Sequence, residues 1–575
     1  TSTAGRMPTC PGPTRSPKAR PTFADPAGRV SIVKFLKLGV SAAAIALVVA
    51  VGGSYLAPVL FAPRQNFHVN SADPALVERG RYIAQASDCV ACHTAKGGKA
   101  FAGGLAMQTP IGTIYSTNIT PDKDTGIGRY DFADFERAVR HGIRKDGSPL
   151  YPAMPYVSYA VLTDGDVQAL YAYFTSAVQS VAQHNQASTI PWPKNMRWPL
   201  AWWQVLFGGH RSFTPPEGAA PQVVRGAYLV EGAGHCGACH TPRGVAFQEK
   251  VLKDGSGGDF LSGSELEGWY AKSLRHEDTG LATWSQQEIA DFLKTGRNTH
   301  TAAFGSMAEV IEHSAQHLSD ADSSAIASYL VSLSPRPGRT PSAPKAKDTT
   351  TAKLYEGAEH SPGALGYVAQ CAPCHRLNGK GTPRLFPALA GNSLVETDNP
   401  SSLIQITLSG GAMAGTPADR TRPSMPELAR LDDRTVADIL TFIRSSWGNK
   451  GSPVSGDDVA AMRSLIARKP ADHLPEDAKM LSASAEDVKA GQDLALDRGK
   501  GNCLACHTIK GGDAPSSVGR ELVNMRRRFP NRADLVEILT NEPVRNSIAP
   551  MPAFGRNHIL TKAEIEQIID FLYTL

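Results

Sequence analysis

Cys89-Val-Ala-Cys92-His93 is a pentapeptide whose pattern, Cys-x-x-Cys-His, occurs four times in this chain of 575 residues. The other copies are Cys236-Gly-Ala-Cys239-His240, Cys371-Ala-Pro-Cys374-His375 and Cys503-Leu-Ala-Cys506-His507. Two thiols three residues apart can form thioethers to the two vinyl groups of one haem, and the adjacent histidine then lies under the iron. The sequence therefore predicts four covalent haem c groups with His93, His240, His375 and His507 as proximal iron ligands.

A single Cys-x-x-Cys pair has two other interpretations, a thiol redox site and half of a structural zinc site. A zinc site needs two such pairs close together, and each pair here stands alone. Four copies with a histidine directly after the second cysteine favour haem over both alternatives. They use eight of the nine cysteines, so that Cys10 has no assigned role.

Length and charge restrict the number of domains and the kinds of partner that this chain can have. A chain of 575 residues is several times the usual domain size, so several domains are expected. The formal net charge of +5 at pH 7 counts no cofactor, and each haem would bring two propionate carboxylates. This balance gives no support to nucleic-acid binding.

Residues 38–62 contain no charged side chain, and as a helix they would extend about 37 Å, enough to cross a bilayer. More Lys and Arg residues precede this stretch than follow it closely, which predicts a cytoplasmic N-terminus. We expect residues 1–37 to be disordered and cytoplasmic, and the haem domains to lie in the periplasm of a bacterium, anchored to its inner membrane by this single pass. A cleaved signal peptide is the alternative.

An internal repeat follows each haem motif at a constant spacing. An aromatic residue stands eleven positions after a leucine in four segments, Leu162 to Tyr173, Leu318 to Tyr329, Leu431 to Phe442 and Leu560 to Phe571. Each reads as an amphipathic helix with a capping residue directly after the leucine. We expect Asp166, Asp322 and Glu564 to complete capping boxes with Thr163, Ser319 and Thr561. Asp432 caps the third copy without an acidic partner.

Before the first motif, Asp73 and Pro74 predict the start of another helix that runs over residues 75–86. A helix leading into the motif and a second helix closing the domain resemble the layout of small class I cytochromes c. This resemblance implies a sixth iron ligand, usually methionine, in the loop before the closing helix. The matching residues are Met154, Met307, Met425 and Met551, and we assign Met107, Met413 and Met525 to packing.

The motif and methionine pairs divide the chain into domains joined by connections of different composition. The fold class is predicted to be all-α, with four tandem class I cytochrome c domains after one N-terminal transmembrane helix. The domains are expected at residues 73–181, 221–334, 354–449 and 485–575. Residues 335–353 and 450–484 are expected to be linkers. Residues 182–220 form a connection rich in Trp and Pro, which either packs between the first two domains or docks a partner subunit or the membrane.

Several longer stretches carry a more specific resemblance. They are Pro110-Ile-Gly-Thr-Ile-Tyr-Ser-Thr-Asn-Ile-Thr-Pro121, Leu150-Tyr-Pro-Ala-Met-Pro155, Met196-Arg-Trp-Pro199, Cys239-His-Thr-Pro-Arg243, Phe386-Pro-Ala-Leu-Ala-Gly391 and Phe442-Ile-Arg-Ser-Ser-Trp-Gly-Asn449. In these, domains one to three resemble the three-haem cytochrome c subunit of membrane-bound bacterial dehydrogenases acting on alcohols, aldehydes, gluconate and other polyols. The resemblance covers about two thirds of the chain.

This resemblance implies partners that the spacing of residues does not reveal. Such subunits carry electrons from a catalytic subunit, a quinoprotein, flavoprotein or molybdoprotein, and a small third subunit can accompany them. The acceptor is ubiquinone, a soluble cytochrome c or a terminal oxidase. The family pattern ends after three haems, whereas Gly501-Asn-Cys-Leu-Ala-Cys-His507 and Ala549-Pro-Met-Pro-Ala-Phe-Gly555 resemble the monohaem subunit of the sulfur-oxidising cytochrome pair.

The predicted function is therefore electron transfer without substrate chemistry on this chain. The sequence shows no Ser-His-Asp grouping, Gly-rich nucleotide loop or HExxH motif, so we expect the catalytic site on a partner. The alternative is a cytochrome that oxidises thiosulfate or sulfite at its own catalytic haem. Four apparent His/Met sites, closed to substrate, argue against that alternative.

Overall fold

The computed structural model describes residues 45, 48–49, 51–54, 68–95, 97–208, 211–255, 257–341, 347–419, 422–468, 484–512, 516, 519–529, 532–545 and 551–575. The predicted disordered stretch, most of the predicted membrane span at residues 38–62, and Cys10 lie outside these residues. Within the described part of the chain, no helix is both long and apolar enough to cross a membrane. Two compact units are present, Thr1–Leu56 and Ala57–Leu575, and the second is described below.

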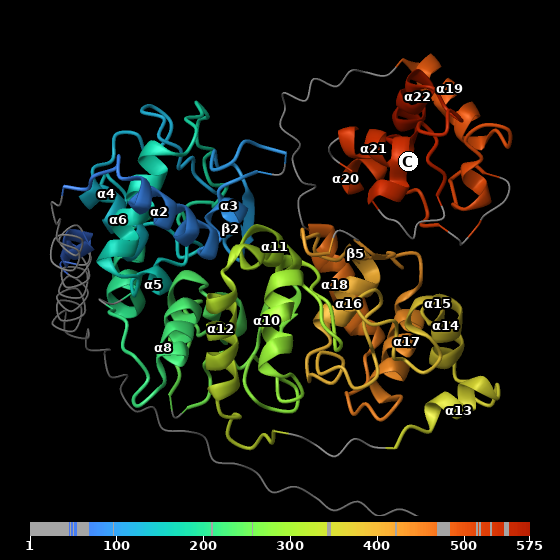
Figure 1. Ribbon diagram of the computed structural model, residues 1–575, viewed down its shortest axis with the longest axis horizontal. Coiled ribbons are helices and arrows are strands. Elements are labelled where there is room, and N and C mark those ends of the chain that lie inside the picture. The colour runs from blue at the N-terminus through green and yellow to red at the C-terminus, as the bar shows by residue number, and fades with distance from the viewer. Residues whose placement is uncertain are drawn as a thin grey trace, which may run out of the picture. The chain divides into compact units, whose positions relative to one another are not determined.

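The second unit contains a pair of packed helices that recurs four times (Figure 1). The pairs are α2 (Pro74–Ala86) with α6 (Asp164–Ser176), α8 (Pro221–Tyr228) with α12 (Asp320–Ser332), α14 (Pro362–Gln370) with α17 (Asp433–Ser445), and α19 (Ala485–Leu496) with α22 (Lys562–Leu572). Each pair encloses one Cys-x-x-Cys-His motif, and we call the four resulting units domains one to four. The structure is mostly helical, as predicted.

Each domain contains further helices, most of which lie between the two helices of its pair. Domain one contains α3 (Cys89–Cys92), α4 (Phe132–His141) and α5 (Tyr156–Tyr159); domain two contains the π-helix η2 (Leu229–Ala233), α9 (Gly237–His240), α10 (Gln286–Thr295), α11 (Ser306–His313) and the 3-10 helix η3 (Ala315–His317). Domain three contains α13 (Thr350–Tyr355), α15 (Ala372–His375), α16 (Ser401–Ser409) and α18 (Gly456–Arg468). Domain four contains the 3-10 helix η4 (Cys503–Ala505), α20 (Met525–Arg528) and α21 (Arg532–Arg545).

The all-α prediction omits three short antiparallel hairpins that the described residues contain. They are β1 (Ala106–Thr109) with β2 (Gly112–Tyr115), β3 (Ser264–Leu266) with β4 (Trp269–Ala271), and β5 (Gly411–Ala412) with β6 (Ser424–Met425). Each lies between the haem motif and the closing helix of its domain. The longest strands have four residues, so the hairpins shape the loops and the helices build the cores.

The closing helices begin at the capping residues that the sequence predicts. The side chains of Thr163, Ser319, Asp432 and Thr561 each accept a hydrogen bond from the backbone N–H three residues later. Such a bond satisfies a donor that has no partner inside the helix, and it contributes about 1 kcal/mol to stability. The starts of these helices are therefore determined by local sequence.

A glycine in the first helix of every pair allows the two helices to approach closely. A Cβ atom on Gly80 would lie 1.9 Å from the backbone oxygen of Ala169 in α6. The glycines at the matching places are Gly226, Gly363 and Gly491, where the corresponding distances are 2.0, 2.2 and 1.9 Å. In domain one the same Cβ would also lie 2.7 Å from that of Tyr173, the repeated aromatic residue, which thus covers the glycine.

Domains one and two are joined by a reciprocal exchange of hydrogen bonds. The hydroxyl of Tyr82 in α2 donates to Asp322 in α12 at 2.6 Å, and the hydroxyl of Tyr228 in α8 donates to Asp166 in α6. Each tyrosine thus reaches from the first helix of one domain to the closing helix of the other. The two domains also share one apolar core, so they form a single packed unit with approximate two-fold symmetry in these contacts.

Because of these hydrogen bonds between domains, the capping-box prediction is wrong for two of its three acidic residues. Glu564 completes a capping box, as expected, but Asp166 and Asp322 use their carboxylates differently. Asp166 accepts a hydrogen bond from Arg79 at 2.7 Å, and Asp322 accepts two from Arg225 at 2.7 and 2.8 Å, in addition to those from the tyrosines. An arginine in the first helix and a tyrosine in the neighbouring domain offer more donors than the backbone at the helix start, so the acids turn towards them.

Domain three packs on domain two through a buried arginine. Arg297 is 0% exposed, and its guanidinium donates to the backbone oxygens of Arg384 and Ala414 and pairs with Asp419 at 3.1 Å. Within residues 450–484, α18 adds Val459 and other apolar side chains to the core of domain three. This helix therefore belongs structurally to domain three.

The connection between domains one and two contacts both of them. It contains α7 (Trp198–Trp203) and the π-helix η1 (Gln204–Gly208). The indole N–H of Trp203 donates to the backbone oxygen of Ala246 in domain two at 2.9 Å, and Gln204 donates to that of Gly142 in domain one at 2.7 Å. These contacts agree with the packing interpretation of this segment, although Trp192 is 79% exposed.

Candidate functional site

Each Cys-x-x-Cys-His motif forms one turn of helix, so its three reactive side chains lie on one side of the backbone. The backbone N–H of the histidine donates to the carbonyl oxygen of the first cysteine at 2.8–3.0 Å in all four copies. Positions i, i+3 and i+4 of a helical turn share one face. The turns lie in or next to α3, α9, α15 and η4.

The four motif histidines are oriented in the same way. In each, ring atom Nδ1 lies within hydrogen-bond distance of a backbone carbonyl oxygen from a later loop. The carbonyl partners are Thr117 at 2.7 Å for His93, Lys272 at 2.7 Å for His240, Pro387 at 2.9 Å for His375 and Arg520 at 2.5 Å for His507. A carbonyl oxygen can only accept, so Nδ1 carries the proton and Nε2 keeps its lone pair for a metal.

The charge state of these side chains fits haem attachment. Burial lowers the pKa of all four motif histidines, that of His240 to about 4, so the rings are neutral. Burial raises the pKa of Cys89, Cys236 and Cys371 to about 12. Uncharged thiols match the uncharged thioethers that haem attachment forms from them. The residues present therefore fit a covalently bound haem.

A left-handed residue precedes the first cysteine in three of the motifs. Asp88, His235 and Asn502 have φ values of 52°, 34° and 46°. Asp, His and Asn are the non-glycine residues most often found there, so this was a readable signal that the sequence reasoning missed. The residue lets the chain leave the first helix and turn directly into the motif. Domain three differs, because α14 continues to Gln370.

The four methionines assigned as sixth ligands are all half-buried. Met425 lies in β6, and Met154, Met307 and Met551 pack at the edges of the apolar cores. Two of the competing methionines are more deeply placed, since Met413 is 8% and Met525 2% exposed. Met107 lies in β1, opposite Ile114. Ligation itself stays a prediction from the sequence.

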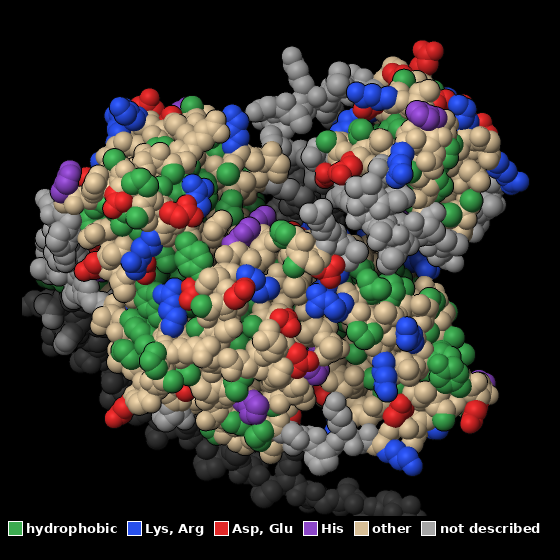
Figure 2. All heavy atoms as spheres, viewed as in Figure 1, with side chains coloured by type: hydrophobic (Ala, Val, Ile, Leu, Met, Phe, Trp, Pro, Cys, Tyr) green, Lys and Arg blue, Asp and Glu red, His purple; other side chains and the backbone are tan. Residues whose placement is uncertain are grey.

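Charges do not gather into one strong patch on the molecular face drawn in Figure 2. Lys and Arg side chains there are interspersed with Asp and Glu side chains over the described residues. A protein that binds nucleic acid usually concentrates positive charge along one face. This view of the surface thus offers no support for nucleic-acid recognition.

Comparison with known proteins places this architecture in a family. The family model described as cytochrome c matches residues 77–177 and 361–447, and the model described as cytochrome c oxidase, cbb3-type, subunit III matches residues 486–572. The cytochrome c subunit of gluconate 2-dehydrogenase from Pantoea cypripedii is 51% identical over 402 residues, which are 68% of this chain and 91% of the relative.

Two further relatives extend the match. The cytochrome c subunit of alcohol dehydrogenase (quinone) from Gluconacetobacter polyoxogenes is 47% identical over 453 residues, 77% of this chain and 94% of the relative. The protein of the same description from Gluconobacter oxydans is 46% identical over 416 residues, 70% of this chain and 84% of the relative. This chain belongs to the cytochrome c subunits of dehydrogenases. It is an electron carrier of a dehydrogenase complex, with multiple cytochrome c domains.

Family membership confirms the resemblance predicted from the sequence, including the prediction that this chain carries electrons and not the catalytic site. The fourth domain is confirmed as a cytochrome c domain, and the four Cys-x-x-Cys pairs are consistent with four haem c groups. The structure adds the backbone carbonyls that orient the histidines, which the motif does not reveal. Thr117 and Pro387 both lie in stretches that carried the resemblance.

Proposed function

We propose that this cytochrome c subunit holds four haem c groups with His/Met ligation and relays electrons from a periplasmic dehydrogenase subunit to the respiratory chain. The observation that supports this most directly is the common orientation of the four motif histidines, each with Nδ1 on a carbonyl oxygen. Nε2 is thereby left to bind iron at every site. Each haem would supply an iron that gains and loses one electron.

The residues of the chain determine how easily that electron moves. The cysteines would fix each macrocycle to the backbone, and the histidine and methionine would hold the iron and leave no open position for a substrate. Methionine as the sixth ligand raises the reduction potential above that of a bis-histidine site. Burial of the site limits the rearrangement of water when the charge on the iron changes.

The donor and the acceptor lie outside this chain. The names of the relatives specify gluconate and alcohol as substrates of their complexes, and a quinone in one of them; we propose an alcohol, aldehyde or sugar-acid dehydrogenase as the donor. The catalytic subunit would be a quinoprotein, flavoprotein or molybdoprotein. Residues 38–62 would anchor the chain in the inner membrane, with the haem domains in the periplasm.

Domain four is proposed as an exit towards a soluble cytochrome c or a terminal oxidase. It lies beyond the part that resembles three-haem subunits, and a family model named for an oxidase subunit matches it. Ending the chain at residue 468, just after α18, removes this domain and the hydrogen bond from Arg520 to the backbone oxygen of Met425, but it leaves the apolar cores of the other three domains complete. The shortened complex should still reduce a ubiquinone analogue and should lose its activity with cytochrome c. If the full-length and shortened complexes reduced cytochrome c equally fast, domain four would not be the exit for electrons.

Ligation by methionine is tested in domain three with a matched pair of variants. Met425→Leu should create a high-spin ferric signal and lower the potential of one haem, because the sulfur ligand is lost. Met413→Leu should change neither, since Met413 is buried in the apolar core. The haem content of both should remain four per chain in a pyridine haemochrome assay. The assignment is wrong if the high-spin signal follows Met413 instead.

A further inference from the structure

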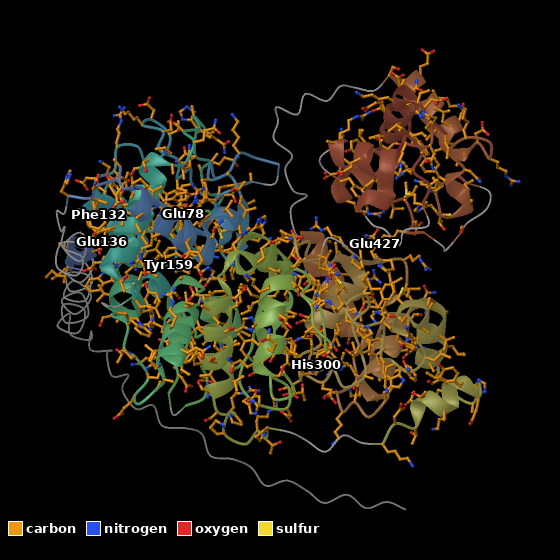
Figure 3. All side chains as sticks on the ribbon, in the orientation of Figure 1. Glu78, Phe132, Glu136, Tyr159, His300 and Glu427 are labelled. Atoms are coloured by element: carbon orange, nitrogen blue, oxygen red, sulfur yellow. The ribbon has the colours of Figure 1, made fainter. Side chains whose placement is uncertain are left out.

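Three residues make a contact between the haem motifs of domains one and two. The hydroxyl of Tyr159 donates to the backbone oxygen of Ser87 at 2.8 Å. The ring of His235, in domain two, packs edge-on against the Tyr159 ring with 5.7 Å between centroids and 77° between planes. Tyr159, labelled in Figure 3 where α5 approaches domain two, is 6% exposed.

The contact involves residues that stand next to two haem attachment points in the sequence. Ser87 is two residues before Cys89 of domain one, and His235 is the residue before Cys236 of domain two. A path of covalent bonds, one hydrogen bond and one ring contact therefore leads from Cys89, through the Ser87 carbonyl and the Tyr159 and His235 rings, to Cys236. Because a carbonyl oxygen only accepts, the Tyr159 hydroxyl must be the donor at this point.

The surroundings hold this contact in one arrangement. Two Tyr-to-Asp hydrogen bonds bind the same pair of domains, and both domains contribute to one core. Next to this contact, the hydroxyl of Ser314 in domain two donates to the backbone oxygen of Ala86, the residue before Ser87, at 3.4 Å. The junction is thus rigid and close to both haem sites.

We propose that Tyr159 and His235 are positioning residues that fix the haems of domains one and two relative to each other and couple them for electron exchange across the Ser87 carbonyl. This rests on the proposed function, in which each site holds a haem. One electron would pass between the two haems, so that the donor iron would go from ferrous to ferric and the acceptor iron from ferric to ferrous. No bond would form or break, and the Tyr159 hydroxyl would keep its proton.

Two variants of the full-length holoprotein test the Tyr159 hydroxyl and the His235 ring separately. Tyr159→Phe removes only the hydroxyl and keeps the ring. His235→Asn removes the ring but suits the left-handed backbone, since Asn502 occupies the corresponding position in domain four with φ 46°. Tyr171→Phe is the matched control, because its hydroxyl donates to the backbone oxygen of Tyr130 at 3.2 Å within domain one and away from the motif.

The main measurement is electron redistribution among the haems after pulse reduction of a small fraction of the sites, followed by rapid absorption spectroscopy. Displacing a reacting group by about 1 Å can slow a reaction up to 10²-fold, so we expect the fastest redistribution phase to slow by about tenfold in Tyr159→Phe and in His235→Asn. The control should retain the wild-type rate. The ferric EPR signals of these two haems, which depend on ligand orientation, should shift in both variants and remain unchanged in the control.

The outcomes distinguish this proposal from the proposed function. Fewer than four haems per wild-type chain would overturn the function itself. Four haems with wild-type spectra and an unchanged redistribution rate in Tyr159→Phe would overturn the coupling alone. If His235→Asn fails to fold, Tyr159→Phe decides the question, because it removes a single oxygen atom. If Tyr171→Phe slowed the redistribution equally, the cause would be a general destabilisation of the protein, and the proposal would be rejected.

Discussion

Replacing Gly80 by alanine should strongly destabilise the unit formed by domains one and two. The added Cβ atom would lie 1.9 Å from the backbone oxygen and 2.5 Å from the backbone carbon of Ala169 in α6. Non-bonded heavy atoms prefer about 3.5 Å, so α2 and α6 would have to move apart by about 1.5 Å. Neither obstacle is the end of a flexible side chain, and the helix backbones themselves must shift.

The magnitude follows from what the shift disturbs. Overpacking of a well-packed core costs about 1–3 kcal/mol, and separation of the helices also stretches the hydrogen bond between Arg79 and Asp166 across their interface. We therefore expect a loss of about 3 kcal/mol in the free energy of unfolding. For a unit larger than 150 residues, this corresponds to a fall of about 6–12 °C in Tm.

Scanning calorimetry of the holoprotein measures this effect, and Gly165→Ala serves as the control. Gly165 is in the first turn of α6, and the nearest atom to its added Cβ is Arg79 Nη2 at 4.0 Å. This substitution has room and should stabilise by about 0.4–1 kcal/mol. If Gly80→Ala melts within 2 °C (about 1 kcal/mol) of the wild type, or if both variants fall together, the close crossing of α2 and α6 is refuted.

Three further predictions concern single side chains. Hydrogen bonds from Arg225 and Tyr82 outweigh the burial of Asp322, which alone would raise its pKa, and they hold that pKa below its ordinary value. This stabilisation is present above pH about 4 and is lost as pH falls through the lowered pKa. Asp322→Asn should therefore lower the free energy of unfolding by about 2–4 kcal/mol at pH 7. The loss of stability on acidification should also be smaller in this variant than in the wild type. Arg444→Met should destabilise domain three by about 3–5 kcal/mol in calorimetry, because Arg444, 0% exposed, donates to three backbone carbonyls. Trp203→Phe should cost about 1 kcal/mol in the same assay by losing its bond to a carbonyl of domain two.

The sequence predicted best those features that depend on a few neighbouring residues. Thr163 and Thr561 cap the helices that follow them, because a hydroxyl needs only the backbone three residues later. The turn of the haem motif is equally local, since His93 donates to the carbonyl of Cys89 within the same pentapeptide. Such interactions are encoded in short patterns.

The prediction failed where a side chain had a better partner far along the chain. Asp166 and Asp322 have the spacing of a capping box, but their carboxylates instead bind side chains up to 240 residues away in sequence. The spacing is the same for Glu564, which does complete its box. In α2 and α8 an arginine precedes the packed glycine and donates to the acid, whereas Ala490 stands at that place in α19.

The sequence by itself determined the chemistry of this protein: four pairs of thiols, each with a histidine, and the start of every closing helix. The tertiary structure alone decided how these parts are oriented and coupled. Thr117, for example, orients His93 from 24 residues away, and the ring of His235 packs against that of Tyr159 across a boundary between domains. Covalent chemistry and capping act within one turn of chain, whereas orientation and coupling depend on packing between segments that only the folded chain brings together.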